Sequence, residues 1–236
     1  MIYLCNMELT NLKELSLCDS KITDISPLEK ANFPLLETLS LGKNKISSIE
    51  SINRLNFPKL KNILLGINKI KDISPLKQYK SPILCILALF ENLISDISPL
   101  TNINAPNLEQ ISLGSNIEDI TPLTKCNFPK LKQLGLKSNK IKNISALKNV
   151  NFPKLEVLYL NYNEIVDINP LKSTNFQNLS KLGLDHNKIK KIAPLSYLKC
   201  SKLNSLNISH NSFRPASSQN KEDIEYLKRK FGNILV

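Results

Sequence analysis

Two histidines carry the metal-binding chemistry that this chain offers. His186 and His210 are its only histidines, they lie 24 residues apart, and Asp185 precedes the first of them. If residues 24 apart occupy adjacent turns of a coil, the two rings are roughly 5 Å apart by strand spacing. Zn²⁺ takes three or four protein ligands, and the pattern supplies no complete set. We therefore expect both histidines to lie at a variable, solvated position and to bind no metal.

Other catalytic signals are missing as well. The sequence contains no G-x-S-x-G nucleophile motif and no glycine-rich loop that would hold a phosphate. The acid pair Glu118 and Asp119 falls in a turn without a facing pocket. We expect no catalytic residue, no cofactor and no small-molecule substrate.

The cysteines indicate a reducing compartment. They are odd in number, form no C-x-x-C pair, and lie at Cys5, Cys18, Cys85, Cys126 and Cys200. Free thiols of this kind are typical of cytosolic proteins. No signal peptide precedes the pattern described below, and the longest apolar run, 83–90, is too short to span a bilayer. We expect a cytoplasmic protein.

A 24-residue period organises nearly the whole chain, with the pattern L-x-x-L-x-L-x-x-N-x-I-x-x-I-x-P-L. One step is 23 residues long, because Asn116 is followed directly by Ile117. The first leucine of the pattern falls at Leu12, Leu36, Leu60, Leu84, Leu108, Leu131, Leu155, Leu179 and Leu203. Each repeat predicts one short strand and one return segment.

Proline placement supports the same organisation. Twelve of the 13 prolines fall at two positions of the repeat. Proline is excluded from paired strands and from helix interiors, so these positions mark a return side of extended or 3₁₀ turns. Five phenylalanines recur in phase and are expected to fill the core of that side: Phe33, Phe57, Phe128, Phe152 and Phe176.

Asparagine recurs at the end of each turn. A short amide there can satisfy backbone groups left unpaired inside the coil, each of which would otherwise cost ~1–3 kcal/mol. Ser20 takes the position in the first repeat. The predicted structural ladder is Asn44, Asn68, Asn92, Asn116, Asn139, Asn163, Asn187 and Asn211.

Outward strand positions are mostly small and polar, with two apolar exceptions. Apolar side chains that face water without a core to join favour an interaction site, and aromatic residues serve as its anchors. The alternative is that 83–90 is a degenerate repeat with relaxed patterning. The predicted partner-binding residues are Leu64, Ile67, Ile86, Phe90, Val157, Tyr159 and Tyr162.

A net charge of +12 at first suggests nucleic acid. The lysines cluster, however, after the ladder asparagines and on the return side, and the strand face carries only Lys137 and Lys181. A single-strand binding groove would combine basic residues with stacking aromatics. We therefore disfavour nucleic acid and an anionic membrane as partners.

The chain divides into a solenoid over 1–214 and a carboxyl-terminal cap over 215–236. The cap is expected to hold a short amphipathic helix that ends at Gly232 and covers the last repeat with Ile224, Leu227 and Phe231. The first repeat begins in mid-pattern, since Leu4 aligns with Leu28, and Met1 is therefore interpreted as the start of a fragment or of an incomplete gene product.

The repeat consensus resembles the leucine-rich repeat family. The variant I-x-D-I-S-P-L, at 22–28, 70–76 and 94–100, is similar to the branch that contains the type 1 phosphatase regulatory subunit and the internalins. The resemblance implies an α/β solenoid: a right-handed superhelix, or horseshoe, with a parallel concave sheet, a turn-rich 3₁₀ convex side and a capping helix. It also implies a non-enzymatic protein that binds other proteins along the concave face.

Three functions remain open on the sequence. The first is an intracellular protein-binding module that uses the concave sheet. The second is a substrate-selecting fragment of a larger signalling enzyme, such as a kinase or a ubiquitin ligase. The third, which the lysine distribution disfavours, is a basic scaffold for nucleic acid or an anionic membrane.

Overall fold

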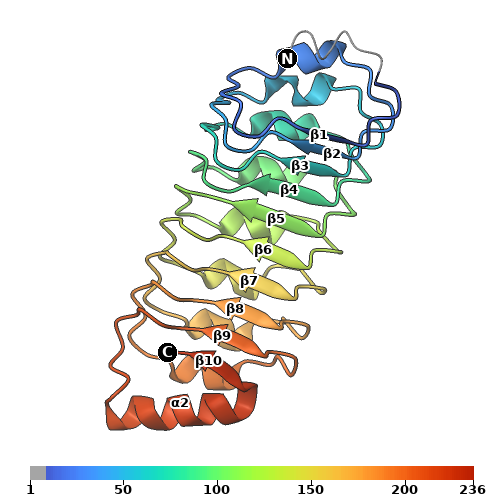
Figure 1. The fold of residues 1–236 in the computed structure, drawn as a ribbon. Coiled ribbons are helices and arrows are strands. Elements are labelled where there is room, and N and C mark those ends of the chain that lie inside the picture. The colour runs from blue at the N-terminus through green and yellow to red at the C-terminus, as the bar shows by residue number, and fades with distance from the viewer. Residues whose placement is uncertain (1–8) are drawn as a thin grey trace.

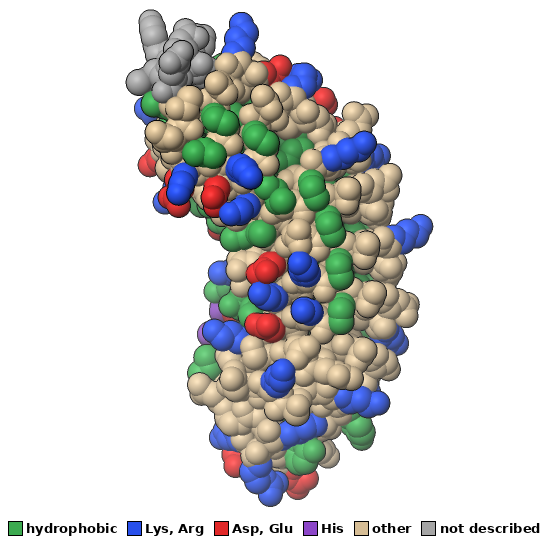
Figure 2. All heavy atoms as spheres, turned by 90° about the vertical axis from the view of Figure 1, so that its right-hand side faces the viewer, with side chains coloured by type: hydrophobic (Ala, Val, Ile, Leu, Met, Phe, Trp, Pro, Cys, Tyr) green, Lys and Arg blue, Asp and Glu red, His purple; other side chains and the backbone are tan. Residues whose placement is uncertain are grey.

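The computed structural model describes residues 9–236. The expectations that concern Met1, Leu4 and Cys5 lie outside the described residues. The chain winds into an elongated stack, with one layer of strands in front and one of 3₁₀ helices behind (Figure 1). Its side view is hollowed on the side of the strands, so the sheet is concave (Figure 2).

The sheet contains ten parallel strands in chain order. Each inward leucine or isoleucine pairs with the one a repeat later, as Leu15 does with Leu39 and Leu39 with Ile63. The strands are Glu14–Ser16 (β1), Thr38–Ser40 (β2), Asn62–Leu64 (β3), Ile86–Leu89 (β4), Gln110–Leu113 (β5), Gln133–Gly135 (β6), Val157–Tyr159 (β7), Lys181–Gly183 (β8), Ser205–Asn207 (β9) and Asn233–Leu235 (β10).

Short 3₁₀ helices form the opposite layer, as the in-phase prolines predicted. In six of the eight, proline lies in the first turn, where a backbone N–H would have no partner within the helix, so its absence costs no hydrogen bond. Their bounds are Ser26–Lys30, Glu50–Arg54, Ser74–Gln78, Ser98–Asn102, Thr121–Lys125, Ser145–Lys148, Asn169–Ser173 and Ala193–Tyr197.

The aspartate of the I-x-D-I-S-P-L variant begins these helices. In the second occurrence of the variant the backbone N of Ser74 donates to Asp72 Oδ1 at 2.7 Å, and its hydroxyl donates to Oδ2 at 2.7 Å. These two bonds lower the pKa of Asp72. The same turn occurs at Asp24, Asp96 and Asp119, so the motif is a structural turn signal.

One continuous apolar core runs between the two layers from Leu15 to Phe231. The five in-phase phenylalanines all lie in it, and two pairs stack across neighbouring repeats, with ring centroids 5.7 Å apart for Phe33 and Phe57. A single repeat cannot bury its own apolar side, so the core exists only through stacking.

Helix α2 (Ser218–Phe231) closes the end of the core with Ile224, Leu227 and Phe231. The Ser217 hydroxyl accepts from Asn220 N at its start, and Gly232 follows its end. The sequence did not predict β10, which follows the helix and pairs with β9. Across residues 9–236 no helix is both long and apolar enough to cross a membrane.

Candidate functional site

The concave face presents three outward positions per repeat. Two belong to the strand and one follows it, and most are occupied by Ser, Thr, Asn, Gln or Gly. Large apolar side chains on this face are therefore exceptions among small, polar neighbours. They form two apolar places. The first, around β3 and β4, consists of Leu64, Ile67, Ile86 and Phe90, and the second, around β7, consists of Val157, Tyr159 and Tyr162.

The first place is built by strand register. Asn62 pairs with Ile86 and Leu64 with Ala88, so Leu64 and Ile86 lie on neighbouring strands and are half-buried. Phe90 is 40% exposed, and its ring occupies the space where a side chain on Gly66 of the preceding repeat would lie. A Cβ on Gly66 would come within 2.5 Å of Phe90 Cε1, so glycine is what admits the ring at this point.

Ile67 adds an apolar side chain at a strained backbone position. The residue before the ladder asparagine is left-handed in eight of the nine repeats, and at Ile67 φ is +59°. A β-branched residue in this region is an outlier that costs on the order of 1–3 kcal/mol. The other residues at this position are Asp19, Lys43, Glu91, Ser138, Tyr162, His186 and His210.

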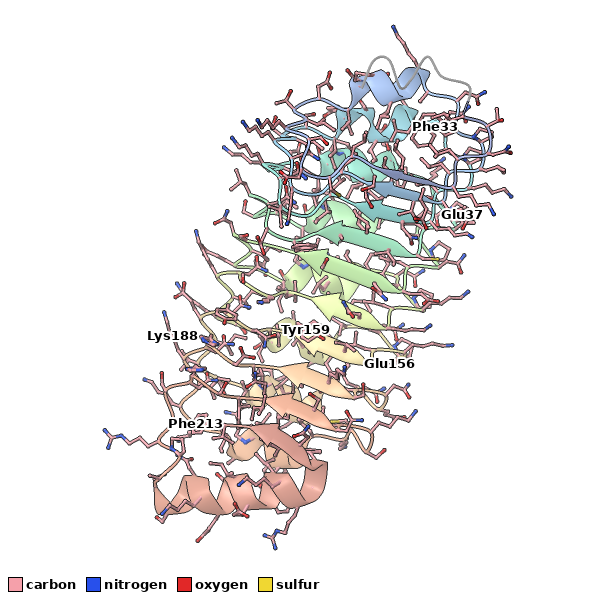
Figure 3. All side chains as sticks on the ribbon, in the orientation of Figure 1. Phe33, Glu37, Glu156, Tyr159, Lys188 and Phe213 are labelled. Carbon is pink, nitrogen blue, oxygen red and sulfur yellow. The ribbon has the colours of Figure 1, made fainter. Side chains whose placement is uncertain are left out.

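The second place has Tyr159 at its centre. Tyr159 lies on β7 between Gly135 of β6 and Gly183 of β8, so neither paired residue puts a side chain beside its ring (Figure 3). Val157 precedes it on the same face and is half-buried, as Tyr159 itself is. The space over Gly183 is taken by the Asn161 amide, because a Cβ there would collide with Asn161 Oδ1.

Tyr162 belongs to a stack of three rings that the sequence reasoning did not assemble. Its ring lies 4.0 Å from that of His186 at an angle of 11°, and His186 lies 4.2 Å from His210 at 26°. Lys137 Nζ lies 5.1 Å from the centroid of the Tyr162 ring. The 24-residue period held the signal, because all three rings occupy the left-handed position before a ladder asparagine.

Asp185 holds this stack to the sheet. Its side chain is buried, the Asn161 amide donates to Oδ1, and His186 Nδ1 lies 3.0 Å from Oδ2. The histidines were expected to be neighbours on adjacent turns at a variable, solvated position. Their rings do lie on adjacent turns, 4.2 Å apart, and His210 is exposed, whereas His186 is half-buried between Tyr162 and His210.

The two edges of the sheet differ in charge. At the edge where the strands begin, acids and bases alternate and pair, with Lys61 Nζ 2.8 Å from Glu37 and Lys132 Nζ 2.9 Å from Glu109. Figure 2 looks onto this edge and shows the red and blue side chains together. At the opposite edge lysines predominate, and of these Lys188 pairs with Glu164 at 2.7 Å.

The asparagine ladder lies just inside that lysine edge. In mid-solenoid, Asn139 Oδ1 accepts from Ile117 N at 3.0 Å, and its Nδ2 donates to the carbonyls of Leu113 and Leu136 at 3.0 Å each. Each side chain thus connects two successive turns. The same Oδ1 bond is formed by Asn44, Asn68, Asn92, Asn139, Asn163, Asn187 and Asn211.

Asn116 is a correction to the predicted ladder. The residue after a ladder asparagine normally donates its N–H to the preceding repeat, as Lys45 does to Ile22 at 2.8 Å. Here Asn116 itself makes that bond, to Ile94 at 3.3 Å, and its side chain has no hydrogen bond to any described residue. The missing residue is therefore the left-handed one, and Gly114 spans the shortened turn with φ at +154°.

No group of three or more His, Cys, Asp or Glu side chains able to hold a metal occurs in the part of the chain that the structure describes. An open groove lies at the far end instead, where Tyr197 and Tyr226 line the space between the last 3₁₀ helix and α2. This groove is separate from the sheet face.

Known families match two parts of the chain. The family described as leucine rich repeat matches residues 129–189, and leucine rich repeats in two copies match 10–54 and 34–78. A search of curated protein sequences found no match.

Solved structures match nearly the whole length. An internalin (inlF) from Listeria monocytogenes is similar with 28% identity over 97% of this chain and 74% of its own, at a TM-score of 0.66. Internalin C2 of the same organism covers 89% of this chain and 81% of its own, with 28% identity and a TM-score of 0.67. The ectodomain of the Arabidopsis thaliana receptor kinase GASSHO1/SCHENGEN3 shares the fold at 19% identity, with a TM-score of 0.56 over 89% of this chain and 28% of its own.

Proposed function

Because the chain belongs to the leucine-rich repeat family, we propose that it is a non-catalytic module that binds a protein partner on the concave face of its sheet. The single observation that carries the proposal is the pair of apolar places, around Phe90 and Tyr159, in a face that is otherwise small and polar. Aromatic anchors surrounded by small residues are typical of protein interfaces.

The dimensions of the face support a protein rather than a small ligand. Ten strands at ~4.8 Å spacing give a sheet on the order of 40 Å long, which suffices for an interface of ~800 Å² per partner. The two anchors are three strands apart, roughly 14 Å. A partner that contacts both must therefore span several repeats.

Backbone strain gives independent support. Ile67 keeps a β-branched apolar side chain at φ of +59°, where a glycine or an asparagine would be easier to accommodate. Its backbone N donates to the Phe90 carbonyl of the following repeat at 2.9 Å, so Ile67 lies beside the first apolar place. Strain that persists beside an exposed apolar group is consistent with selection for contact with a partner.

Site-specific crosslinking tests the proposal. A photoreactive amino acid at Ser112, on β5 between the two apolar places, is expected to capture a partner in cells of the source organism. The same amino acid at Lys148, exposed on the convex side, is the matched control. Capture from Lys148 but not from Ser112 would contradict concave-face binding.

A further inference from the structure

The outward positions of β6, β7 and β8 form a charged frame around Tyr159. Lys137 follows Gly135 by two residues on one side, and Lys181 precedes Gly183 by two on the other, so the lysines lie at opposite corners. Both are exposed, and neither forms an ion pair with any residue in 9–236.

The only carboxylate in this frame is already engaged. Asp185 is buried and bonded to Asn161 and His186, so it is not free to neutralise either lysine. The surrounding outward residues are Gln133, Val157 and the two glycines, which are uncharged. The frame therefore offers two unpaired positive charges on either side of an aromatic anchor.

From this arrangement, and resting on the proposed function, we propose that β6 to β8 bind an extended acidic peptide segment of the partner. Its acidic side chains would pair with Lys137 and Lys181, and an apolar side chain between them would pack on Tyr159. Charge complementarity of this kind sets partner choice and association rate.

Register fixes the spacing of the acids. The two lysines are two strands apart, ~9.6 Å, and four residues apart along the strands, ~13 Å, which places their Cα atoms roughly 16 Å apart. An extended peptide rises about 3.3 Å per residue. The segment should therefore carry its acids about four to six residues apart.

Nucleic acid fits the same frame poorly. Tyr159 is the single ring of this frame that could stack on a base, because both faces of the neighbouring Tyr162 are covered, by Lys137 and by His186, and both faces of His186 are covered by its neighbours. Bases need free aromatic faces for stacking. Two lysines some 16 Å apart also do not form the continuous basic track that follows a phosphate backbone.

Peptide selection tests the inference. Random twelve-residue peptides, displayed and selected on the full chain at low salt, should become enriched in Asp and Glu at the stated spacing around an apolar residue. Synthetic peptides from that pool should lose ~10-fold or more in affinity for the Lys137→Glu and Lys181→Glu variants, less so as salt is raised. Lys148→Glu on the convex side is the matched charge reversal and should change affinity less than about twofold.

The outcomes separate the two proposals. Peptides without acidic bias that still need Tyr159 would overturn the acidic segment and leave concave-face binding in place. Peptides indifferent to Tyr159→Ala and Phe90→Ala alike would overturn both. A failure to enrich any peptide on the parent over the Lys137→Glu, Lys181→Glu double variant would overturn the acidic segment alone. If a twenty-nucleotide oligothymidine bound more tightly than the selected peptides, and lost that binding in the Lys137→Glu and Lys181→Glu variants, the frame would be assigned to nucleic acid.

Discussion

At the scale of single residues, the asparagine ladder shows how many buried backbone groups one side chain can satisfy. Asn139 satisfies a donor in the preceding repeat and carbonyls in both repeats, all of them inside the coil. The period predicted the ladder positions, because every repeat needs the same turn. The period could not decide whether Asn116 belongs to the ladder, because the one missing residue of this repeat could lie before or after it. The backbone conformation at Gly114 shows that the missing residue lies before it.

The substitution Asn139→Ala should lower the free energy of unfolding by ~1–3 kcal/mol, because buried backbone groups lose their partners. Asn116→Ala is the matched control, since the Asn116 side chain makes no hydrogen bond to described residues. Urea denaturation followed by circular dichroism measures both. If both variants lost the same free energy of unfolding, the hydrogen bonds of the ladder amides would not be the source of its stabilisation.

Thiol reactivity tests burial on the return side. Burial raises the pKa of the Cys126 thiol to about 12 and that of Cys200 to about 11. Because the thiolate is the reactive form, both should react slowly with a disulfide reagent at pH 8 in the folded protein and quickly in urea. Exposed Cys18 should react quickly in both states. Fast modification of Cys126 in the native protein, identified by mass spectrometry, would contradict the packing described.

At the scale of elements, the repeat pattern specified the strands and the 3₁₀ helices well, because each is dictated by local alternation and by proline. What it missed needed contacts between elements. The three-ring stack joins turns 24 and 48 residues apart, and each ring alone looks like an ordinary surface residue. Strand β10 has only three residues and no repeat after it, so its pairing with β9 leaves no periodic trace.

The cap is expected to hold the last repeats together. Leu227 is buried between α2 and the end of the core, so Leu227→Ala should destabilise the protein by roughly 2–5 kcal/mol through lost burial and a new cavity. Lys228→Ala, the adjacent exposed residue, should change stability little. Hydrogen exchange should locate the loosening in β8 and β9, and uniform loosening out to β1 would contradict a local capping role.

At the scale of the whole molecule, stacking makes a thin core that is stable only as a continuous structure. Acid should weaken it partly through exposed carboxylates. The hydrogen bond from Arg54 lowers the pKa of Glu29 to about 2, so this contact stabilises the fold above the pKa of the unfolded state, near 4.5. Its contribution falls as the pH drops from about 5 towards 2.

The variant Glu29→Gln isolates this contribution from general charge repulsion. Its urea midpoint should lie slightly below that of the parent at pH 7, because an exposed ion pair contributes little. The difference should shrink as the pH falls from about 5 to 2, where about half of the Glu29 carboxyl groups are protonated in the folded parent as well. A difference that is constant from pH 7 to pH 2 would show that the carboxylate charge is not involved.

Affinity for a captured partner is the most direct measurement of the central claim. Phe90→Ala and Tyr159→Ala should each weaken binding by ~2 kcal/mol or more, about 30-fold, while the thermal unfolding midpoint changes little, since both side chains lie on the sheet face rather than in the core. Charge reversal of the exposed return-side lysines Lys130 and Lys154 should leave binding unchanged. Parent-like affinity in both aromatic variants, with binding abolished by the lysine reversals, would contradict the account.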